Sequence, residues 1–454
     1  MLHLSEMLSE FVYNLRYEDL PEEVVETTKR YIADYYAAAF AGIKVNGIFN
    51  DAVIDVITDM GGKEECDFIY SSRRIPTANA AFLSACLAHG ADMDDGNRKA
   101  MGHVGAHVIS TAMTLCQILD VSGKDIITAI NVGYEIYNRV AAAVQPGLVH
   151  RGFHSTGTAG AIACGAVAAK LMGMDKDGIY NTMALSAVQA SGLIIIAESG
   201  QSCKPINPAN AAKTGILSAK IISKGVKSSE YFLESKKGYF HAMSDEVDEK
   251  MITEGLGETF TICESYMKPY PSRRHTHCGI ECALDIRKRI AANDRIKDVK
   301  VYIYKNAIDI AGQIKVPKVS DDAKFSVHYS LAVALLKGHF NLGDLDISAI
   351  DEETLRVIDS IELIVDPSME DRDKGIRGSK VVVTTEGGSV LEKTVLIPLG
   401  DAANPLTWED LEDKLSACSE GLLSKGNQEK LLENIHILDR FNKIDTINLY
   451  NIQL

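Results

Sequence analysis

The stretch LPEEVVETTKRYIADYYAAAFAG, residues 20–42, decides the fold class of this chain. Pro21 stands at its start, two glutamates follow, apolar residues recur at helical spacing, and Gly42 closes it. An early proline, acids in the first turn and a terminal glycine are the usual boundary signals of an α-helix. The stretch therefore predicts one long amphipathic helix.

Similar amphipathic runs follow through the first two-thirds of the chain. Several are rich in small residues, as in TAGAIACGAVAAKLMG (158–173) and ALSAVQASG (184–192). Small side chains let helix backbones approach closely, so these runs predict an all-helical core of stacked helices. We expect these helices over residues 75–90, 105–121, 124–143, 156–173, 176–192 and 208–224.

The composition changes near residue 266, where β-branched, alternating segments begin. VKVYIY (299–304) and SIELIVD (360–366) predict strands, and KVVVTTEGGSVLEKTVLI (380–397) predicts a hairpin. Helical runs at 278–292, 321–338 and 351–358 lie among them. We therefore expect a mainly α protein, in which residues 266–397 form an α+β domain.

The helical pattern returns after the hairpin. NPLTWEDLEDKLSAC (404–418) opens with a capping-box pattern from Thr407 to Asp410. This final part could rejoin the first domain. We therefore predict an all-helical domain made of residues 1–265 and 398–454, with the α+β domain inserted.

The bulk composition limits the classes of partner. The chain has 454 residues, a formal net charge of −15, 46% hydrophobic residues and 24% charged residues. These fractions are typical of a globular protein, and the length predicts two or three domains. Nucleic acids and anionic membranes require a basic face, so the acidic balance argues against both partners. The apolar run LIIIA (193–197) is far too short to span a bilayer.

Two features predict a cytoplasmic location. The N-terminus, MLHLSEMLSEFVYNLRYEDLPEE, carries acids where a secretory signal needs cations. The nine cysteines are scattered, and the closest pair, Cys278 and Cys282, has neither redox nor zinc spacing. We expect reduced thiols within the core.

The segment HGADMDDGNRKAMGHVGAH (89–107) gathers acids, histidines and cations. A calcium loop beginning at Asp92 would need a glycine and a glutamate where Asn97 and His103 stand. His103 and His107 have the i, i+4 spacing of a zinc helix, but the glutamate of H-E-x-x-H is absent. Dinucleotide-binding and G-x-S-x-G motifs are also absent. The segment therefore predicts an acid–base site without metal or cofactor.

Cations and histidines recur just before predicted helix starts. His154 precedes a helix that Ser155 or Thr156 would cap, and Lys204 precedes one with Asn207 as N-cap. A helix N-terminus attracts anions through its partial positive charge and its amide donors. In an acidic chain, this recurrence predicts a small carboxylate or phosphate ligand. The side chains concerned are Arg98, Lys99, His103, His154, Lys204, Lys268, Arg273, Arg274, His275 and His277.

Several spaced motifs, taken in order, resemble the MmgE/PrpD family, whose members include 2-methylcitrate dehydratase, cis-aconitate decarboxylase and iminodisuccinate epimerase. The resemblance extends through almost the whole chain. It implies an all-α domain with an inserted α+β lid domain, a homodimer, and a cofactor-free active site between helical domain and lid. The motifs are YEDLPEEVVETTKRYIAD, AAFLSACLAHGADMDD, GYEIYNRV, RGFHSTGTAGA, KPINPANAAKTG, KPYPSRRHTH and GDAANPLTWEDLEDKL.

Carried over position by position, the resemblance implies five catalytic residues: Asp92, His103, His154, Lys204 and Lys268. All of these except Asp92 are also among the cations and histidines that precede predicted helices.

Two departures from the decarboxylase branch leave the substrate open. That branch resembles DFDDT at the acidic motif, whereas Gly96 follows the aspartate pair here, and the segment to His103 is one residue longer. That branch also offers a lid tyrosine, near whose place this chain has Ala311 and Gly312. Both differences count against cis-aconitate decarboxylase.

The chemistry that the resemblance implies is proton abstraction beside a carboxylate. Lys204 and Lys268 would stabilise the resulting charge, and His103 and His154 are candidates for general base and acid. Asp92 would orient a histidine or keep a lysine protonated. The remaining predicted side chains would bind the substrate, and an arginine among them could grip a second carboxylate.

We therefore predict a cofactor-free hydro-lyase, similar to 2-methylcitrate dehydratase, that eliminates water from a small di- or tricarboxylate. An epimerase or isomerase of a dicarboxylate, a cis-aconitate-type decarboxylase and a catalytically silent carboxylate-binding protein are the alternatives.

Overall fold

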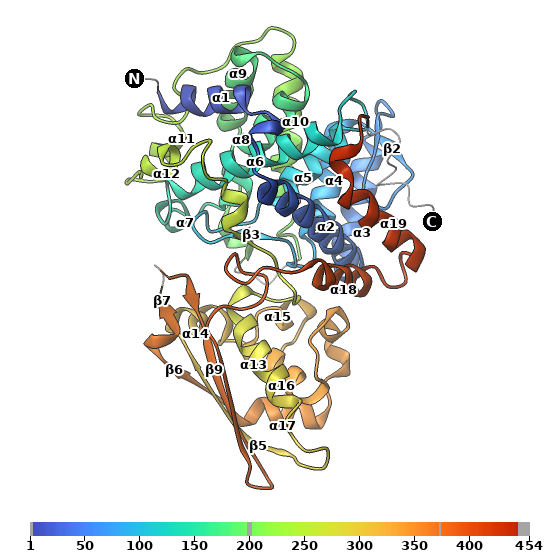
Figure 1. Ribbon diagram of the computed structural model, residues 1–454, viewed down its shortest axis with the longest axis vertical. Helices are drawn as coiled ribbons and strands as arrows, with labels where there is room; N and C mark the ends of the chain where they lie inside the picture. Colours follow the sequence, from blue (N-terminus) through green and yellow to red (C-terminus); the bar gives the residue numbers. More distant parts are fainter. Residues whose placement is uncertain (1–2, 198–201, 372–373, 444–454) are drawn as a thin grey trace. The chain divides into compact units, whose positions relative to one another are not determined.

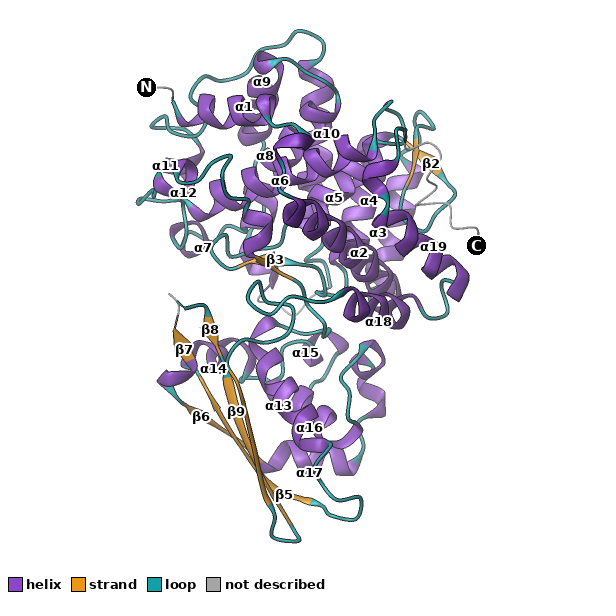
Figure 2. Cartoon of the chain, viewed as in Figure 1, coloured by secondary structure: helices purple, strands orange, loops and turns teal. Residues whose placement is uncertain are grey.

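The computed structural model describes residues 3–197, 202–371 and 374–443 (Figure 1). The chain divides into two compact units, one made of residues 1–267 and 408–454 and the other of residues 268–407. Helices make up most of the first unit, and the largest sheet belongs to the second (Figure 2). The predicted mainly α fold class is confirmed.

The first unit is a stack of helices. Its longer helices are α1 (Leu4–Asn14), α2 (Glu22–Val45), α3 (Gly47–Asp59), α4 (Thr77–His89), α5 (Gly105–Leu115), α6 (Gly123–Ala142), α8 (Ser155–Leu171), α9 (Lys176–Val188), α10 (Ile206–Ile222), α18 (Trp408–Ser419) and α19 (Lys425–His436). Among its described residues are also three short α-helices: α7 (Gly147–His150), α11 (Tyr239–Met243) and α12 (Lys250–Thr253).

The long helix predicted from the opening stretch is present as α2, but Gly42 does not end it. The helix begins directly after Pro21 and continues to Val45. A Cβ atom at Gly42 would lie 1.9 Å from the main-chain oxygen of Leu87 in α4. Gly42 is therefore a contact point at which two helices approach closely, rather than a terminator.

Small residues bring α8 and α10 into close contact in the same way. A Cβ atom at Gly215 of α10 would lie 2.5 Å from the Cβ of Cys164 in α8. The neighbouring α4 is surrounded on every side, because all its residues from Thr77 to His89 are buried. The last residue of this central helix, His89, leads directly into the acidic segment.

The second unit contains a four-stranded sheet in the order β10–β9–β5–β6. Its strands are β5 (Ile296–Ile303), β6 (Ile361–Val365), β9 (Ser379–Thr385) and β10 (Val390–Val395). The predicted hairpin forms β9 and β10, which are antiparallel, whereas β5 and β6 are parallel. Alternate residues of β9, such as Val381 and Val383, are buried, as its period of two requires.

One α-helix among the described residues of this unit precedes β5, and the other four lie between β5 and β6 in the sequence. They are α13 (His277–Arg287), α14 (Lys305–Ala311), α15 (Ser320–Ala323), α16 (Val327–Lys337) and α17 (Glu352–Ser360). The run predicted as one helix over 321–338 is divided into α15 and α16. The hydroxyl oxygen of Ser326 accepts the N–H of Tyr329 at 3.0 Å, and this N-cap starts α16 anew.

The C-terminal helices belong to the first unit, where α18 lies beside α2 (Figure 1). Lys414 of α18 donates to Asp34 Oδ1 of α2 at 2.5 Å, and both side chains are buried. The same ammonium group donates to the main-chain oxygen of Met93 at 2.9 Å. The two ends of the chain are thus joined by a buried ion pair behind the acidic segment.

The cysteines and the apolar helices bear on two predictions, reduced thiols in the core and no segment that spans a bilayer. All nine cysteines are free thiols, and seven of them are buried. Within the described residues, no helix combines the length and apolar character that crossing a bilayer requires.

Candidate active site

The acidic segment begins with an aspartate in an unusual backbone conformation. Asp92 follows the end of α4, is buried, and has a φ of 57°. Residues other than glycine rarely adopt this left-handed region, and they do so mainly where the surroundings enforce it. The bond from Lys414 to the oxygen of Met93 fixes the peptide group between Met93 and Asp94, one residue further along the chain. The C-terminal helix therefore supports the conformation that presents Asp92.

Asp92, His103 and Lys204 come together in the first unit. Lys204 Nζ lies 2.8 Å from Asp92 Oδ1 and 3.5 Å from His103 Nε2. His103 Nε2 lies 3.7 Å from Asp92 Oδ1. Lys204 precedes α10, and His103 precedes α5, as the sequence predicts. One ammonium group thus contacts both a carboxylate and an imidazole.

The hydrogen bonds of His103 indicate which of its nitrogens is basic. Nδ1 lies 2.8 Å from the main-chain oxygen of Asp95, which can only accept a hydrogen bond. Nδ1 therefore carries the proton of the neutral ring, and Nε2 carries the lone pair that faces Lys204. The backbone N–H of His103 donates to Thr156 Oγ1 at 3.1 Å. Hydrogen bonds thus hold both the backbone of His103, through Thr156, and its ring, through Asp95.

His154 has the opposite tautomer. The side-chain amide of Asn207 donates to His154 Nδ1 at 3.0 Å, so the neutral ring carries its proton on Nε2. Burial, followed by the charge of Lys204, holds the pKa of His154 well below its usual range. His154 is therefore neutral at physiological pH. It can donate a hydrogen bond, but it does not carry an extra proton to transfer.

Asn207 was predicted to cap a helix, and that prediction is wrong. Helix α10 begins at Ile206 with Pro205 in the N-cap position. The amide of Asn207 instead donates to His154 and to the main-chain oxygen of Leu193, at 3.0 and 3.3 Å. The KPINPAN motif contained this residue, but its partner is 53 positions away in sequence.

A second buried cluster lies behind His103. His89, Asp94 and His103 offer nitrogen and oxygen atoms that all lie within 4.8 Å of one another. These residue types can bind a transition metal. The distances describe hydrogen bonding instead, because Asp94 Oδ2 is 2.7 Å from His89 Nδ1 and 3.3 Å from His103 Nδ1. We therefore interpret the cluster as two histidines that share one carboxylate.

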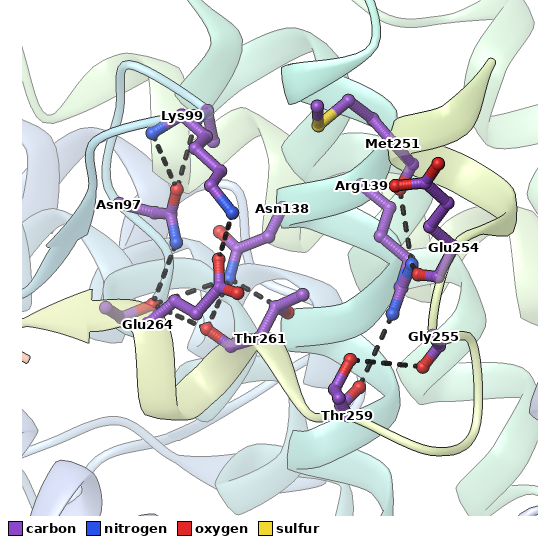
Figure 3. A network of polar contacts seen from close by, with 12 residues as sticks. Asn97, Lys99, Asn138, Arg139, Met251, Glu254, Gly255, Thr259, Thr261 and Glu264 are labelled. Carbon is purple, nitrogen blue, oxygen red and sulfur yellow. Dashed lines mark hydrogen bonds and ion pairs between the residues drawn. The ribbon is translucent and has the colours of Figure 1, made fainter. Parts of the chain in front are cut away.

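The segment that distinguishes this chain, residues 96–102, is fixed by pairing. Strand β3 (Gly96–Asn97) pairs with β4 (Ser265–Tyr266). The side-chain oxygen of Asn97 accepts the N–H groups of Lys99 and Ala100 at 2.9 and 3.1 Å. Figure 3 shows that Lys99 then reaches Glu264, at 2.7 Å. The charge of Lys99 is thus partly compensated at an exposed position, while Arg98 is half-buried.

Helix α6 holds β4 in place through a buried clamp. Arg139 donates to the main-chain oxygens of Met251, Ile252 and Glu254 at 2.8–3.3 Å, and forms a 2.7 Å ion pair with Glu135. Asn138 donates to Thr261 Oγ1 at 3.1 Å. Figure 3 shows this network beside the Asn97–Lys99–Glu264 contacts. The segment that leads into β4 is therefore anchored to the helical core.

Gly96 has a specific neighbour. A Cβ atom at this position would lie 2.5 Å from the hydroxyl oxygen of Tyr266. Tyr266 therefore occupies the space that a threonine side chain would need here. The departure from the DFDDT pattern thus involves two positions, the glycine and the tyrosine that contacts it.

The other predicted cations belong to the second unit. Lys268 is buried, Arg274 forms a 2.8 Å ion pair with Asp401, and the Arg273 guanidinium lies 4.3 Å from the centre of the Phe325 ring. His275 Nδ1 hydrogen-bonds to the hydroxyl of Tyr304. Burial, followed by nearby Arg377, lowers the pKa of His275 to about 3. His275 is therefore neutral.

His277 is fully buried in the same unit, at the first position of α13. Its Nε2 donates to the main-chain oxygen of Ser272 at 3.2 Å. This bond holds the turn that carries Arg273 and Arg274. The roles predicted for the five basic residues of this unit remain predictions.

Comparisons with known proteins match both parts of the chain. The MmgE/PrpD N-terminal domain matches residues 6–251, and the MmgE/PrpD C-terminal domain matches residues 270–440. The cis-aconitate decarboxylase of Homo sapiens is 24% identical over 96% of this chain and 92% of its own length. That of Aspergillus terreus is 24% identical over 95% and 92%, and that of Mus musculus 22% over 96% and 91%. The two domain matches cover most of the chain, which therefore belongs to the MmgE/PrpD family.

Proposed function

We propose that the protein is a lyase that removes a proton next to a carboxylate of a small di- or tricarboxylate and eliminates water. The contact of Lys204 with both Asp92 and His103 carries this proposal. It places a fixed positive charge beside a basic nitrogen in a buried site. A carbanion next to a carboxylate needs both groups, a base to form it and a cation to stabilise it.

The proposed reaction uses residues of the first unit. His103 Nε2 takes the proton from the carbon beside the carboxylate, and the electron pair moves into that carboxylate. Lys204, kept protonated by Asp92, stabilises the added negative charge. The electron pair then forms the double bond and expels the hydroxyl group on the adjacent carbon. That group leaves as water with the proton that His103 had gained, so the protein ends unchanged.

His154 and Asn207 complete the site in this proposal. Because Asn207 fixes the tautomer of His154, its Nε2–H can donate to a substrate oxygen without changing charge. A neutral imidazole donor stabilises a developing negative charge and remains neutral as the pH falls toward its low pKa. No step of the proposed reaction requires a metal or a cofactor.

A cis-aconitate-type decarboxylation is the second candidate. It is favoured by the three cis-aconitate decarboxylases, which match over more than nine-tenths of the chain. The same Lys204 charge would stabilise the carbanion left by departing carbon dioxide, and a site histidine would protonate it. Against it stands the Gly96–Tyr266 pair, which replaces the threonine of the DFDDT pattern.

The test is NMR of the purified protein with a panel of polycarboxylates in heavy water. A new carbon–carbon double bond with loss of water supports the proposal. Release of carbon dioxide would replace it with decarboxylation, and deuterium uptake alone would replace it with epimerisation. No turnover, with ligand binding retained in His103→Ala and Lys204→Ala variants, would indicate a silent carboxylate-binding protein.

A chelator arm tests the metal-free chemistry separately. We expect EDTA to leave the reaction rate unchanged, because Lys204 supplies the stabilising charge. Loss of the rate with EDTA, and its recovery with zinc, would contradict the mechanism. The His89–Asp94–His103 cluster would then need to be reconsidered as a ligand set.

A further inference from the structure

We propose that Asp94 and His89 form a positioning pair that orients His103 and maintains its basicity. This inference rests on the proposed function, since it assigns His103 the role of base. Asp94 contacts Nδ1 of the His103 ring, and His89 contacts Asp94, whereas Lys204 lies near Nε2 on the other edge of the ring. Asp94 and His89 act through Nδ1, whereas the proposed chemistry takes place at Nε2.

The geometry places one oxygen atom between two imidazole rings. Asp94 Oδ2 lies 2.7 Å from His89 Nδ1 and 3.3 Å from His103 Nδ1. The two rings meet edge to face, with centroids 4.6 Å apart. The side chains of His89 and Asp94 are 0% and 2% exposed, so water does not screen this contact. Asp94 Oδ2 thus faces the same Nδ1 that contacts the main-chain oxygen of Asp95 at 2.8 Å, and the two oxygens together fix the orientation of the His103 ring.

The electrostatic need for this carboxylate comes from Lys204. An ammonium group 3.5 Å from Nε2 disfavours a second positive charge on the ring. A base in that position would hold a proton poorly unless a negative charge compensated for it. Asp94 supplies that charge on the other edge of the ring. Burial would raise the pKa of Asp94, but the electrostatic interactions and hydrogen bonds with His103 and His89 together hold it well below the usual range.

The other groups around His103 do not supply the negative charge that Asp94 places beside Nδ1. Asp92 already pairs with Lys204 at 2.8 Å. The Asp95 carboxyl accepts from the hydroxyl of Tyr134 and the N–H of Gly105 at 2.5 and 2.7 Å, and only its main-chain oxygen contacts the His103 ring. The further titratable groups near His103 are His107 and His154, both of whose pKa values are lowered chiefly by burial.

His89 maintains the position of Asp94. Burial is the main cause that lowers the pKa of His89, so the neutral ring donates from Nδ1 to Asp94. Among the described residues, His89 Nε2 has no hydrogen-bond partner, although it is buried. An apolar residue would avoid that cost. The histidine is explained if its Nδ1–H is needed to hold the carboxylate.

The experiment measures the His103 ring directly and then the reaction. The full chain is labelled with ¹⁵N-histidine, and the His103 signals are assigned with a His103→Gln variant. We expect Asp94→Asn to lower the pKa of His103 by about one unit or more, because the compensating charge is lost. We also expect it to lower kcat by about tenfold or more with little change in KM. An unchanged pKa of His103 would overturn the inference.

A second pair of variants keeps the test decisive if Asp94→Asn does not fold. His89→Asn retains an N–H donor near the place of Nδ1, whereas His89→Leu removes it. We expect His89→Leu to lower kcat and His89→Asn to recover most of it. Equal kcat values in the two variants would overturn the role of His89. His328→Asn, at a buried histidine of the second unit, controls for general loss of stability.

The two readouts separate this inference from the proposed function. If the wild-type protein turned over no polycarboxylate but Asp94→Asn still shifted the pKa of His103, the proposed function would fail and the control of His103 by Asp94 would stand. If the wild-type protein were active and that pKa did not move, the function would stand and this inference would fail.

Discussion

Lys204 is the residue on which the proposed chemistry depends most directly, because its ammonium group contacts both Asp92 and His103. We expect Lys204→Gln to lower kcat by about 10²- to 10³-fold, as loss of a donor to a developing anion does. Lys224→Gln, at an exposed lysine just beyond α10, is the matched control and should retain wild-type kinetics. Steady-state kinetics on the substrate identified by NMR check this. Equal losses in both variants would contradict the role of Lys204.

The buried carboxyl group of Asp95 makes the free energy of unfolding depend on pH. Burial, followed by the charge of Asp94, raises the pKa of Asp95 to about 7, although Tyr134 and Gly105 donate to it. The unfolded chain has a value near 3.9. Between about pH 4 and pH 7 the folded state therefore binds more protons than the unfolded state. The stability from this group is fully present below about pH 4 and is lost as the pH rises through 7.

We expect the free energy of unfolding to depend less on pH in Asp95→Asn than in the wild type. Between pH 4 and 7, the slopes of the two curves of free energy against pH should differ by at most about 1.4 kcal/mol per pH unit. Guanidinium unfolding at several pH values in both proteins measures it. The comparison is needed because Glu281 also has a pKa raised to about 7 by burial. Parallel curves would show that Asp95 ionises normally.

At the scale of elements, the Arg139 clamp connects helix α6 to the site. It holds the segment 251–264, which leads into β4, and β4 pairs with β3 next to the acidic turn. Arg139→Met would leave Glu135 as a buried charge without its ion-pair partner. We expect a loss of about 3–5 kcal/mol in the free energy of unfolding.

Lys99→Met, which removes the exposed pair with Glu264, should cost at most about 1 kcal/mol. Thermal or guanidinium unfolding compares the two, and equal costs would contradict the clamp.

The elements themselves were largely predictable because their signals are local. Hydrophobic periodicity and caps marked α2, α4, α6 and α8, and alternation marked the β9–β10 hairpin. Contacts between distant segments were not predictable in this way. Gly42 has the appearance of a helix end in sequence, and only the oxygen of Leu87 shows that it is a crossing point. The run over 321–338 was predicted as one helix because its apolar residues recur at helical spacing. In the structure Ser326 caps a new helix inside it, and a single serine is a weaker sequence signal than the apolar periodicity around it.

In the candidate site, too, residues with a local sequence signal were predictable and contacts between distant residues were not. Lys204 and His103 could be marked in sequence because they precede helices, and the structure brings them together with Asp92. His154 was marked in the same way, but the tautomer of that residue depends on Asn207, which no local pattern connects with it. Lys414 had no signal at all, because it is 321 residues away from Met93.

At the scale of the whole molecule, the Lys414–Asp34 pair joins the C-terminal helices to the N-terminal ones and to the acidic turn. We expect Lys414→Met to cost about 3–5 kcal/mol in stability, because it leaves Asp34 as a buried charge that has lost its ion-pair partner. A double variant with Asp34→Leu should recover most of this loss. Its kcat should remain low, because nothing replaces the bond to the oxygen of Met93.

Unfolding curves and kinetics of the single and double variants provide the measurement. Full activity in the double variant would show that the ion pair contributes only to stability. Loss of activity at recovered stability would show that the C-terminal helix positions Asp92.

The same bond sets the order in which a newly made chain can mature. The ribosome produces the acidic turn early, but the lysine that fixes its peptide comes after the whole second unit. A nascent chain therefore carries Asp92 without its support during most of translation. A chain that ends before α18 therefore lacks both the ion pair with Asp34 and the bond to the main-chain oxygen of Met93.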